Sequence, residues 1–265
     1  MIASTQNARF KALKALSMST SARREAQQTL LDGAHLIEAF IDAGGVPQQI
    51  LLADEGDENY WRQRCPQAAV LGLTPHLLAA LSPVKTPTGV MALIDIPRHP
   101  LSTPPNFAVL MECIQDPGNV GAMLRTAAAA GVDTVYLSLG CADVWSSKVL
   151  RSGMGAHFAL RIEDGVDLLQ VAANWPGYLV ATTLDATCSV YDIEFNGAVA
   201  FVMGNEGAGL SSALREVVTH AVHIPMSGRV ESLNVAAALA VCLFERVRRV
   251  GEDNRRGAPP RKYPG

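Results

Sequence analysis

The amino-acid sequence predicts an α/β protein with two domains. Short apolar runs typical of buried strands alternate with helical stretches in both halves of the chain, which is the pattern of helices packed on sheets. A proline-rich stretch at residues 96–105, IPRHPLSTPP, interrupts this alternation and marks a domain boundary. The 265 residues suffice for one large or two medium domains, each with a core of its own.

The first half, residues 1–96, predicts a small α/β domain. It opens with a basic helical stretch at about residues 6–16. Two more helices are indicated by AHLIEAFIDAGG, which ends in glycines, and by TPHLLAALS, which begins with a capping threonine. QILLA and GVMALIDI read as buried strands. A linker at residues 97–105 would separate this domain from the second one.

Residues 106–250 predict a parallel sheet covered by helices on both faces. Helical stretches lie between most of five strand-like runs, which are FAVLME, TVYLSL, YLVATT, AVAFVM and AVHIP. The last helix is expected at about residues 231–250, where an apolar beginning is followed by arginines. The remaining residues, 251–265, read as a basic, flexible tail without regular structure.

Composition favours a globular protein rather than a disordered one, since 49% of the residues are hydrophobic and 18% are charged. We expect no membrane contact, because no apolar run approaches the roughly 20 residues of a membrane span and a signal-peptide pattern is missing. Five scattered cysteines without a C-x-x-C pair favour reduced thiols in a cytoplasmic protein over a disulfide or zinc framework. His220 and His223 lack a second cluster of ligands, so we expect no metal.

The net charge of -3 conceals two basic ends. The first 24 residues contain no acidic residue but five basic ones, namely Arg9, Lys11, Lys14, Arg23 and Arg24. Residues 246–265 contain seven basic and two acidic residues. Clustered positive charge is what a nucleic-acid backbone selects, although a solvated helix and an unstructured tail would explain the same pattern equally well.

Three loops that follow predicted strands form the candidate site. They are QDPGNVG at 115–121, GNEGAGLS at 204–211 and the beginning of IPMSGRVESLNVAAALAV at 224–241. Each alone has an ordinary explanation as a turn, a helix cap or a glycine loop. Ligands of open α/β sheets bind beyond the carboxyl ends of the strands, so together the loops would converge on one rim of the sheet.

The polar residues of these loops are candidates for chemistry. Asn119 is well placed to cap the helix that contains Arg125, and this arginine has no carboxylate three or four positions away. Small residues around Arg125 would let another helix approach closely. Glu206 is the acid of the glycine-rich loop, and Ser232 and Asn234 precede an alanine-rich helix.

The spacing N-x-x-x-x-x-R at 119–125, G-N-E-G at 204–207 and I-P-M…S-L-N-V at 224–235 resembles the SpoU branch of the SPOUT RNA methyltransferases. That family transfers a methyl group from S-adenosylmethionine to a ribose 2′-hydroxyl. IASTQNARFKALKAL, TLLDGAHLIEAF and LSPVKTPTGVMALI are similar to the family's N-terminal RNA-binding domain, which resembles ribosomal protein L30e. SSKVLRSGMGAHF looks like another stretch of its catalytic half.

The resemblance implies a fold, an assembly and a cofactor. The catalytic domain would contain a deep trefoil knot near its C-terminus, and the chain would form a homodimer. Backbone groups of the second and third loops would form most of the S-adenosylmethionine pocket. Gly204, Ile224 and Leu233 would contact the cofactor, and Met203 and Met226 would flank its adenine.

The resemblance also assigns roles to the polar residues. In the family Arg125 would act as the base or in a phosphate-assisted relay, but a guanidinium stays protonated in almost any protein site. Our hypothesis is that Arg125 binds the phosphate beside the target ribose and polarises the 2′-oxygen. Glu206 would orient Arg125, while Asn119, Ser232 and Asn234 would hold the loop, the ribose and the arginine.

The additional N-terminal domain favours ribosomal RNA, namely 23S RNA, over transfer RNA as the substrate. The basic N-terminal residues Arg9, Lys11, Lys14, Arg23 and Arg24 would form its binding surface. Two other classes stay open at this point. One is a non-catalytic RNA-binding protein of the same fold, and the other is a nucleotide-binding α/β enzyme unrelated to RNA.

Overall fold

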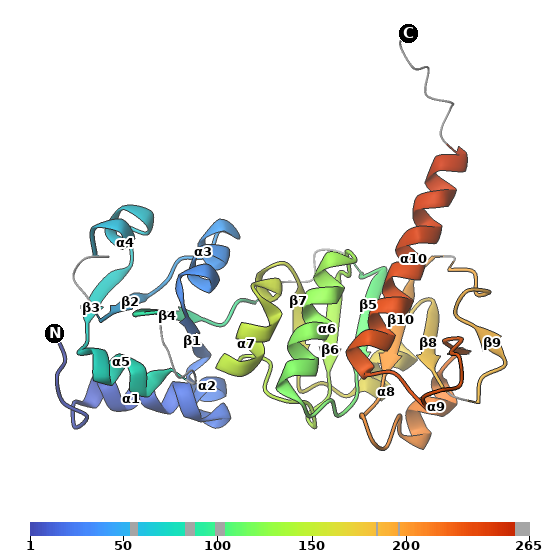
Figure 1. Cartoon of the computed structure of the whole chain (residues 1–265), viewed down its shortest axis with the longest axis horizontal. Coiled ribbons are helices and arrows are strands. Elements are labelled where there is room, and N and C mark those ends of the chain that lie inside the picture. The colour runs from blue at the N-terminus through green and yellow to red at the C-terminus, as the bar shows by residue number, and fades with distance from the viewer. Residues whose placement is uncertain (54–57, 83–87, 99–103, 184, 196, 258–265) are drawn as a thin grey trace, which may run out of the picture. The chain divides into compact units, whose positions relative to one another are not determined.

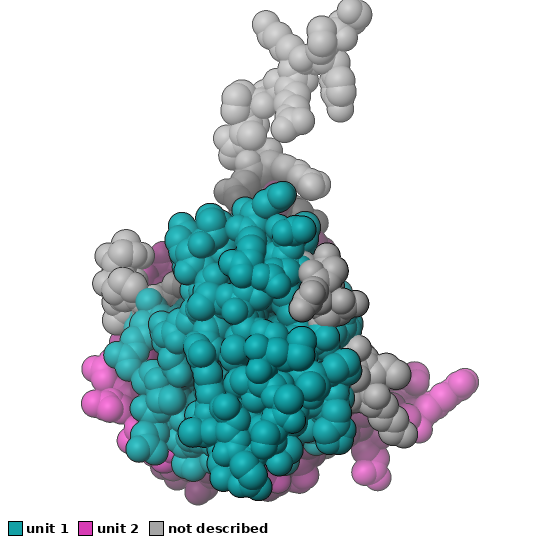
Figure 2. Space-filling view, turned by 90° about the vertical axis from the view of Figure 1, so that its left-hand side faces the viewer, with its two compact units in different colours: residues 1–100, 116–125, 142–161 teal, residues 101–115, 126–141, 162–265 magenta. Residues whose placement is uncertain are grey.

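The computed structural model of the chain describes residues 1–53, 58–82, 88–98, 104–183, 185–195 and 197–257, whose elements are labelled in Figure 1. Two compact units are coloured teal and magenta in Figure 2. The first comprises residues 1–100, 116–125 and 142–161, and the second comprises residues 101–115, 126–141 and 162–265. Two segments of the predicted second domain therefore pack with the first half. Residues 99–103 of the predicted linker lie outside the described residues.

A four-stranded mixed sheet organises the first unit, in the order β1-β4-β2-β3. Its strands are β1 (Gln28–Asp32), β2 (Gln49–Leu52), β3 (Ala69–Gly72) and β4 (Val90–Asp95). β4 runs antiparallel to β1 and β2, whereas β2 and β3 are parallel. The predicted strands β2 and β4 are confirmed, while β1 and β3 were not predicted.

The helices of this part of the first unit are α1 (Ala8–Met18), α2 (Thr20–Ala26), α3 (Ala34–Asp42), α4 (Glu58–Arg64) and α5 (Pro75–Leu81). Asn7 begins α1, because its side chain accepts a hydrogen bond from the Arg9 amide at 2.9 Å. Leucines of α1 and α5 share one buried cluster with β1, β2 and β4. The predicted helices near 6–16, 34–45 and 74–82 correspond to α1, α3 and α5.

The segment 142–161 packs within the first unit. It contains α7 (Ser147–Gly153) and the 3₁₀ turn η2 (Ala156–Phe158). The Phe158 ring packs edge-on against Phe40 at 5.1 Å between centroids, and the Thr29 hydroxyl donates to the Trp145 carbonyl at 2.8 Å. These contacts explain why a segment of the predicted second domain clusters with the N-terminal residues.

Helix α6 (Pro117–Ala129) confirms the close approach that its small residues predict. A Cβ atom on Gly121 would lie 1.8 Å from the Ser152 hydroxyl oxygen, which belongs to α7. The same hydroxyl donates to the Pro117 carbonyl at 3.1 Å. Glycine at position 121 is therefore what allows α6 and α7 to pack so closely.

The second unit contains a seven-stranded sheet in the order β7-β6-β5-β10-β8-β11-β9. The strands are β5 (Phe107–Met111), β6 (Thr134–Leu137), β7 (Arg161–Asp164), β8 (Tyr178–Thr182), β9 (Cys188–Ser189), β10 (Val199–Met203) and β11 (His220–His223). The pairs that join β6, β5, β10, β8, β11 and β9 are parallel. This confirms the predicted parallel sheet and its five strands, while β7 and β9 at its two edges were not predicted.

Helices cover both faces of this sheet. On one face, α8 (Leu168–Ala173) and α9 (Ser212–Val217) share a buried cluster with Ala200 and Val202 of β10. On the other, the guanidinium of Arg246 lies 3.8 Å above the ring of Phe107. Because neighbouring residues of a strand face opposite sides, α10 (Val235–Gly257), which contains Arg246, covers the face opposite α8 and α9.

The bounds of α10 differ from the prediction. The helix begins at Val235 rather than near residue 231, because Asn234 caps it. It continues to Gly257, so residues 251–257 of the predicted unstructured tail are helical. Paired charges stabilise the turn of α10 that precedes this extension, since Glu245 accepts hydrogen bonds from Arg248 and Arg249 at 2.7 Å. Residues 258–265 of the tail lie outside the described residues.

Candidate active site

The loops that follow β5 and β10 are joined by hydrogen bonds at the carboxyl edge of the second sheet. The Asn205 side-chain amide donates to the Cys113 carbonyl at 2.8 Å. The Glu112 carboxylate accepts from the Ser211 amide at 2.8 Å. Because each bond links one loop to the other, the glycine-rich loop is fixed against the strand next to it.

The glycine-rich loop is also closed on itself. Asn205 and Gly209 exchange backbone hydrogen bonds of 3.0 and 2.9 Å, and the Asn205 side-chain oxygen accepts from the amides of Gly207 and Ala208 at 3.0 Å. Gly204 is required where the loop turns back, because a Cβ atom there would lie 2.4 Å from the Gly209 carbonyl carbon. The loop is thus a rigid backbone cradle with no room for a side chain at Gly204.

Gly204→Ala is expected to weaken the binding of the predicted cofactor, S-adenosylmethionine, by about 5- to 150-fold, because forcing a methyl group into a packed site costs about 1–3 kcal/mol. The clash is with backbone, so the loop itself must move. Calorimetric titration with the cofactor measures the effect. Gly251→Ala, where an added methyl group would meet nothing within 4 Å, is the matched control. Unchanged affinity in Gly204→Ala would show that this loop does not shape the pocket.

The third loop leads into α10. The Asn234 side-chain oxygen accepts from the amides of Ala236 and Ala237 at 2.9 and 3.4 Å, so Asn234 has the ordinary role of a helix cap. Ser232 and Leu233 just before it are exposed. Asn234 thereby fixes the point at which the loop turns away from the sheet.

The glycine-rich loop and the third loop surround a cavity of about 600 Å³ within the second unit. The ends of β8, β10 and β11 all contribute to its wall, as expected for a site at the carboxyl edge of a parallel sheet. Eight predicted site residues line it, namely Met203, Gly204, Glu206, Ile224, Met226, Ser232, Leu233 and Asn234. The structure therefore brings together the second and third predicted loops.

Among the other residues that line this cavity, five polar ones were missed by sequence reasoning: Thr182, Thr183, Asn205, Arg215 and His223. The strand-end rule could have found Thr182, Thr183 and His223, because they lie at the ends of β8 and β11. Arg215 had no such signal, since it comes from α9.

The residues of the cavity fit S-adenosylmethionine. The volume lies within the roughly 300–1,000 Å³ of small-molecule sites. Apolar side chains, including Met203, Leu210 and Ile224, offer a surface for a flat heterocycle, and the cradle at Gly204 allows a ligand to approach backbone amides and carbonyls. Glu206 supplies a negative charge, which suits a ligand that contains a sulfonium and an ammonium group.

Asn119 and Arg125 lie on α6, in the part of that helix that belongs to the first unit. The prediction that Asn119 caps the helix is wrong. Asp116 does so, because its carboxylate accepts from the Asn119 amide at 2.8 Å and Pro117 occupies the first helical position. The Arg125 side chain is exposed. That Asn119 and Arg125 act at the cavity stays a prediction.

The predicted RNA surface needs one correction. Arg9, Lys11 and Arg24 are exposed, and Lys14 is half-buried with its ammonium group donating to the Ala80 carbonyl. Arg23 is only 4% exposed and is therefore not available to a phosphate.

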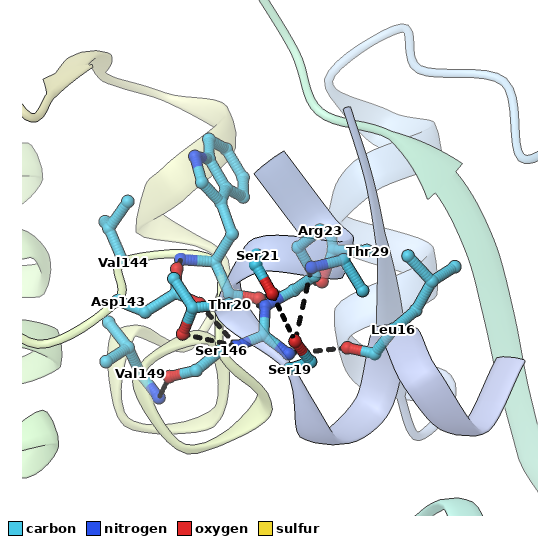
Figure 3. A network of polar contacts seen from close by, with 12 residues as sticks. Leu16, Ser19, Thr20, Ser21, Arg23, Thr29, Asp143, Val144, Ser146 and Val149 are labelled. Carbon is cyan, nitrogen blue, oxygen red and sulfur yellow. Dashed lines mark hydrogen bonds and ion pairs between the residues drawn. The ribbon is translucent and has the colours of Figure 1, made fainter. Parts of the chain in front are cut away.

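Arg23 instead lies at the centre of a polar network, shown in Figure 3. Its Nε atom donates to the Asp143 carboxylate at 2.9 Å, and Nη2 forms an ion pair with the same oxygen. Nη1 donates to the Leu16 carbonyl and, at 3.3 Å, to the Ser17 carbonyl. The basic sequence pattern thus contains one arginine whose role is structural.

The remaining titratable groups were compared with the needs of a metal or redox site. In the part of the chain that the structure describes, no three His, Cys, Asp or Glu side chains are grouped as a metal site requires. Burial lowers the pKa of His157 to about 4, so this residue is a neutral core histidine at pH 7. All five cysteines are free thiols, and burial raises the pKa of Cys242 to about 12. Among the described helices, none is both long and apolar enough to cross a bilayer.

Comparison with known proteins agrees with this geometry. The SpoU rRNA Methylase family matches residues 106–244, and the MRM3-like substrate binding domain matches residues 7–92. The 23S rRNA (guanosine(2553)-2'-O)-methyltransferase RlmP of Bacillus subtilis is 32% identical over 258 residues, covering 92% of this chain and 97% of that protein.

Solved structures resemble the chain over nearly its whole length. The SpoU methyltransferase AviRb from Streptomyces viridochromogenes, in complex with AdoMet, aligns with a TM-score of 0.84 and 30% identity, covering 92% of this chain and 98% of that one. An AdoMet-bound rRNA methyltransferase from Sinorhizobium meliloti aligns with a TM-score of 0.83 and 26% identity, covering 94% and 97%. Both resembling structures hold the cofactor that the cavity fits.

Proposed function

Since this chain belongs to the SpoU rRNA methylase family, we propose that it transfers a methyl group from S-adenosylmethionine to a ribose 2′-hydroxyl of 23S ribosomal RNA. One observation carries the proposal, namely the cavity of about 600 Å³ whose wall contains both the G-N-E-G loop and the I-P-M…S-L-N-V loop. The parallel-sheet fold of the family implies a trefoil knot in the catalytic domain. RNA methylation by S-adenosylmethionine also accounts for a basic N-terminus on an otherwise acidic chain.

The cofactor site is formed by the second and third loops. Gly204, Ile224 and Leu233 contact the cofactor chiefly through backbone groups, and Met203 and Met226 flank its adenine. When bound, S-adenosylmethionine supplies the activated methyl group of a sulfonium ion. The protein's task is to hold the ribose 2′-oxygen in line with that methyl group, because orientation provides much of the rate of such a displacement.

Arg125 acts on the RNA rather than on the cofactor. Its guanidinium binds the phosphate beside the target ribose and polarises the 2′-oxygen. The oxygen forms a bond to the methyl carbon as that carbon's bond to sulfur breaks with its electron pair, and the hydroxyl proton passes to the neighbouring phosphate. Glu206 orients Arg125, whereas Asn119, Ser232 and Asn234 hold the loop and the ribose.

The N-terminal residues hold the ribosomal RNA. Residues 7–92 match a substrate-binding domain, which supports a structured ribosomal RNA over a transfer RNA as the target. Arg9, Lys11 and Arg24 are exposed on α1 and α2, and Lys14 lies beside them on α1. Their charges attract phosphates without regard to base identity.

The enzyme works as a homodimer in the cytoplasm. Phe244 and Val247, one turn apart on α10, are 46% and 37% exposed, and exposed apolar side chains on one helix face support an interface. A ribosomal RNA substrate supports a cytoplasmic location, because ribosomes are assembled there.

The proposed function is tested by mapping ribose methylation across ribosomal and transfer RNA from cells with and without the gene. We expect one 23S nucleotide to lose its 2′-O-methyl group, and the purified protein to restore it in vitro with S-adenosylmethionine. Loss confined to transfer RNA would support that substrate instead. No loss in any RNA, together with no binding of the cofactor, would indicate a non-catalytic RNA-binding protein.

A further inference from the structure

A positive charge that belongs to none of the recognised motifs lies at the cofactor cavity. Arg215 is on the short helix α9, and its side chain lines both the cavity of about 600 Å³ and an adjoining one of about 200 Å³. The smaller cavity lies below the roughly 300–1,000 Å³ of small-molecule sites. A ligand that meets Arg215 would therefore occupy the larger cavity, whose wall also contains Glu206.

The Arg215 guanidinium is held against the glycine-rich loop. Its Nη2 atom would lie 3.4 Å from a Cβ atom built on Gly209, so the charged end of the side chain, rather than its stem, reaches the loop. Gly209 has a φ of +69° and is fixed by its two backbone hydrogen bonds to Asn205. Glycine at this position leaves the space that the guanidinium uses.

Helix α9 holds Arg215 on a rigid base. Ser211 caps the helix, because its hydroxyl accepts from the Leu214 amide at 3.3 Å, and the Arg215 amide donates to the Ser211 carbonyl at 3.0 Å. Leu214, the neighbour of Arg215, is buried in the apolar cluster that α8 and α9 share with β10. Helix α9, which carries Arg215, and the glycine-rich loop, which its guanidinium meets, are therefore both fixed in place.

The charges around the cavity are complementary to a zwitterionic ligand. Within the described residues, the Arg215 guanidinium has no hydrogen-bond or ion-pair partner, and Glu206 lines the same cavity with the opposite charge. S-adenosylmethionine contains two positive groups, the sulfonium and the ammonium, and one carboxylate. A guanidinium fits a carboxylate through two parallel, charge-assisted hydrogen bonds, which an apolar wall cannot provide.

We propose that Arg215 binds the carboxylate of the methionine part of S-adenosylmethionine and selects ligands that contain it. This inference rests on the proposed cofactor site. The backbone cradle and apolar wall bind the adenosine part, which many nucleosides share. Arg215 adds a contact to the amino-acid end, so the site distinguishes the cofactor from nucleosides that lack this end.

Calorimetric titration with two ligands tests the proposal. S-adenosylmethionine and decarboxylated S-adenosylmethionine differ only in the carboxylate. In the wild-type chain we expect the decarboxylated ligand to bind about tenfold more weakly, since hydrogen bonds to charged groups contribute about 1.5–3 kcal/mol and this arginine is partly in solvent. Arg215→Ala should bind S-adenosylmethionine about tenfold more weakly and the decarboxylated ligand as the wild type does, with Arg215→Lys between the two.

Glu216→Ala is the matched control, because Glu216 is the exposed neighbour of Arg215 on α9 and does not line the cavity. Binding of the decarboxylated ligand also reports whether each variant is folded. Equal weakening of both ligands in Arg215→Ala, or no change in either, would overturn the proposal. A raised KM for RNA with unchanged cofactor affinity would overturn it as well and assign Arg215 to the RNA. If the wild-type chain binds neither ligand, the proposed function itself fails.

Discussion

Arg125→Ala is expected to reduce the rate of methyl transfer by about 10²–10³-fold, the usual cost of removing one preorganised donor from a developing negative charge. Its affinity for S-adenosylmethionine should stay within about twofold of the wild type, as for an exposed residue outside the cofactor contacts. The positions three and four residues from Arg125 are occupied by glycine and alanines, so its own helix offers it no ion pair. We therefore expect the partner of this cation to be a phosphate of the incoming RNA.

Arg125→Lys separates charge from geometry. A lysine keeps the positive charge but loses the planar pair of donors, so we expect a rate between those of the wild type and Arg125→Ala. Single-turnover methylation with labelled cofactor measures the chemical step, and calorimetry measures cofactor affinity. Arg62→Ala is the control, because Arg62 is an exposed arginine on α4 whose ion pair with Glu58 contributes little. A rate in Arg125→Ala above about a tenth of the wild type would refute this role.

Much of the fold could be predicted because its signals are local. Of the five predicted strands of the second sheet, β5 and β10 are apolar runs buried at every residue, as expected for central strands of a covered parallel sheet, and β6 and β8 are mostly buried. β7 was missed because three of its four residues are charged, and β9 because it has only two residues. Both are edge strands, and an edge strand needs fewer buried apolar residues than a central one.

The site residues that could be predicted from the sequence are those in loops that directly follow strands. The cavity contains the second and third predicted loops because both follow strands of one parallel sheet. The cap of α6 was assigned to Asn119 instead of Asp116, since Asp-Pro reads equally well as a turn and as a helix start. Arg215 could not be predicted, because only the folded loop places its guanidinium at Gly209.

The burial of Arg23 could not be predicted from the charge pattern of the sequence. In the sequence it is one of five basic residues near the N-terminus, and nothing nearby distinguishes it from Arg24. Its partner Asp143 is 120 positions away, so the burial of Arg23 depends on a contact that only the tertiary fold creates. Its basic neighbours Arg9, Lys11 and Arg24 are exposed, and that they bind RNA stays a prediction.

Arg23→Ala should lower the free energy of unfolding by about 3–5 kcal/mol, because removing one partner of a buried ion pair leaves the other charge without compensation. The side chains of Arg23 and Asp143 are only 5% and 11% exposed, and Arg23 also satisfies the carbonyls of Leu16 and Ser17. Denaturation by urea measures the loss. Tryptophan fluorescence follows the same transition, and one of the three tryptophans, Trp145, lies in the network, since its amide donates to the Asp143 carboxylate at 3.0 Å.

Two further variants decide whether the ion pair or mere packing is responsible. Asp143→Ala should cost about as much as Arg23→Ala, whereas the double substitution Arg23→Met with Asp143→Leu should recover most of the loss, because it removes both buried charges and fills their volume. Arg24→Ala on the same helix should change stability by no more than about 0.5 kcal/mol. If Arg23→Ala behaves like Arg24→Ala, the network does not hold segment 142–161 to the N-terminal residues. If the double variant is as unstable as the single ones, the three carbonyl and hydroxyl contacts of Arg23 outweigh its ion pair.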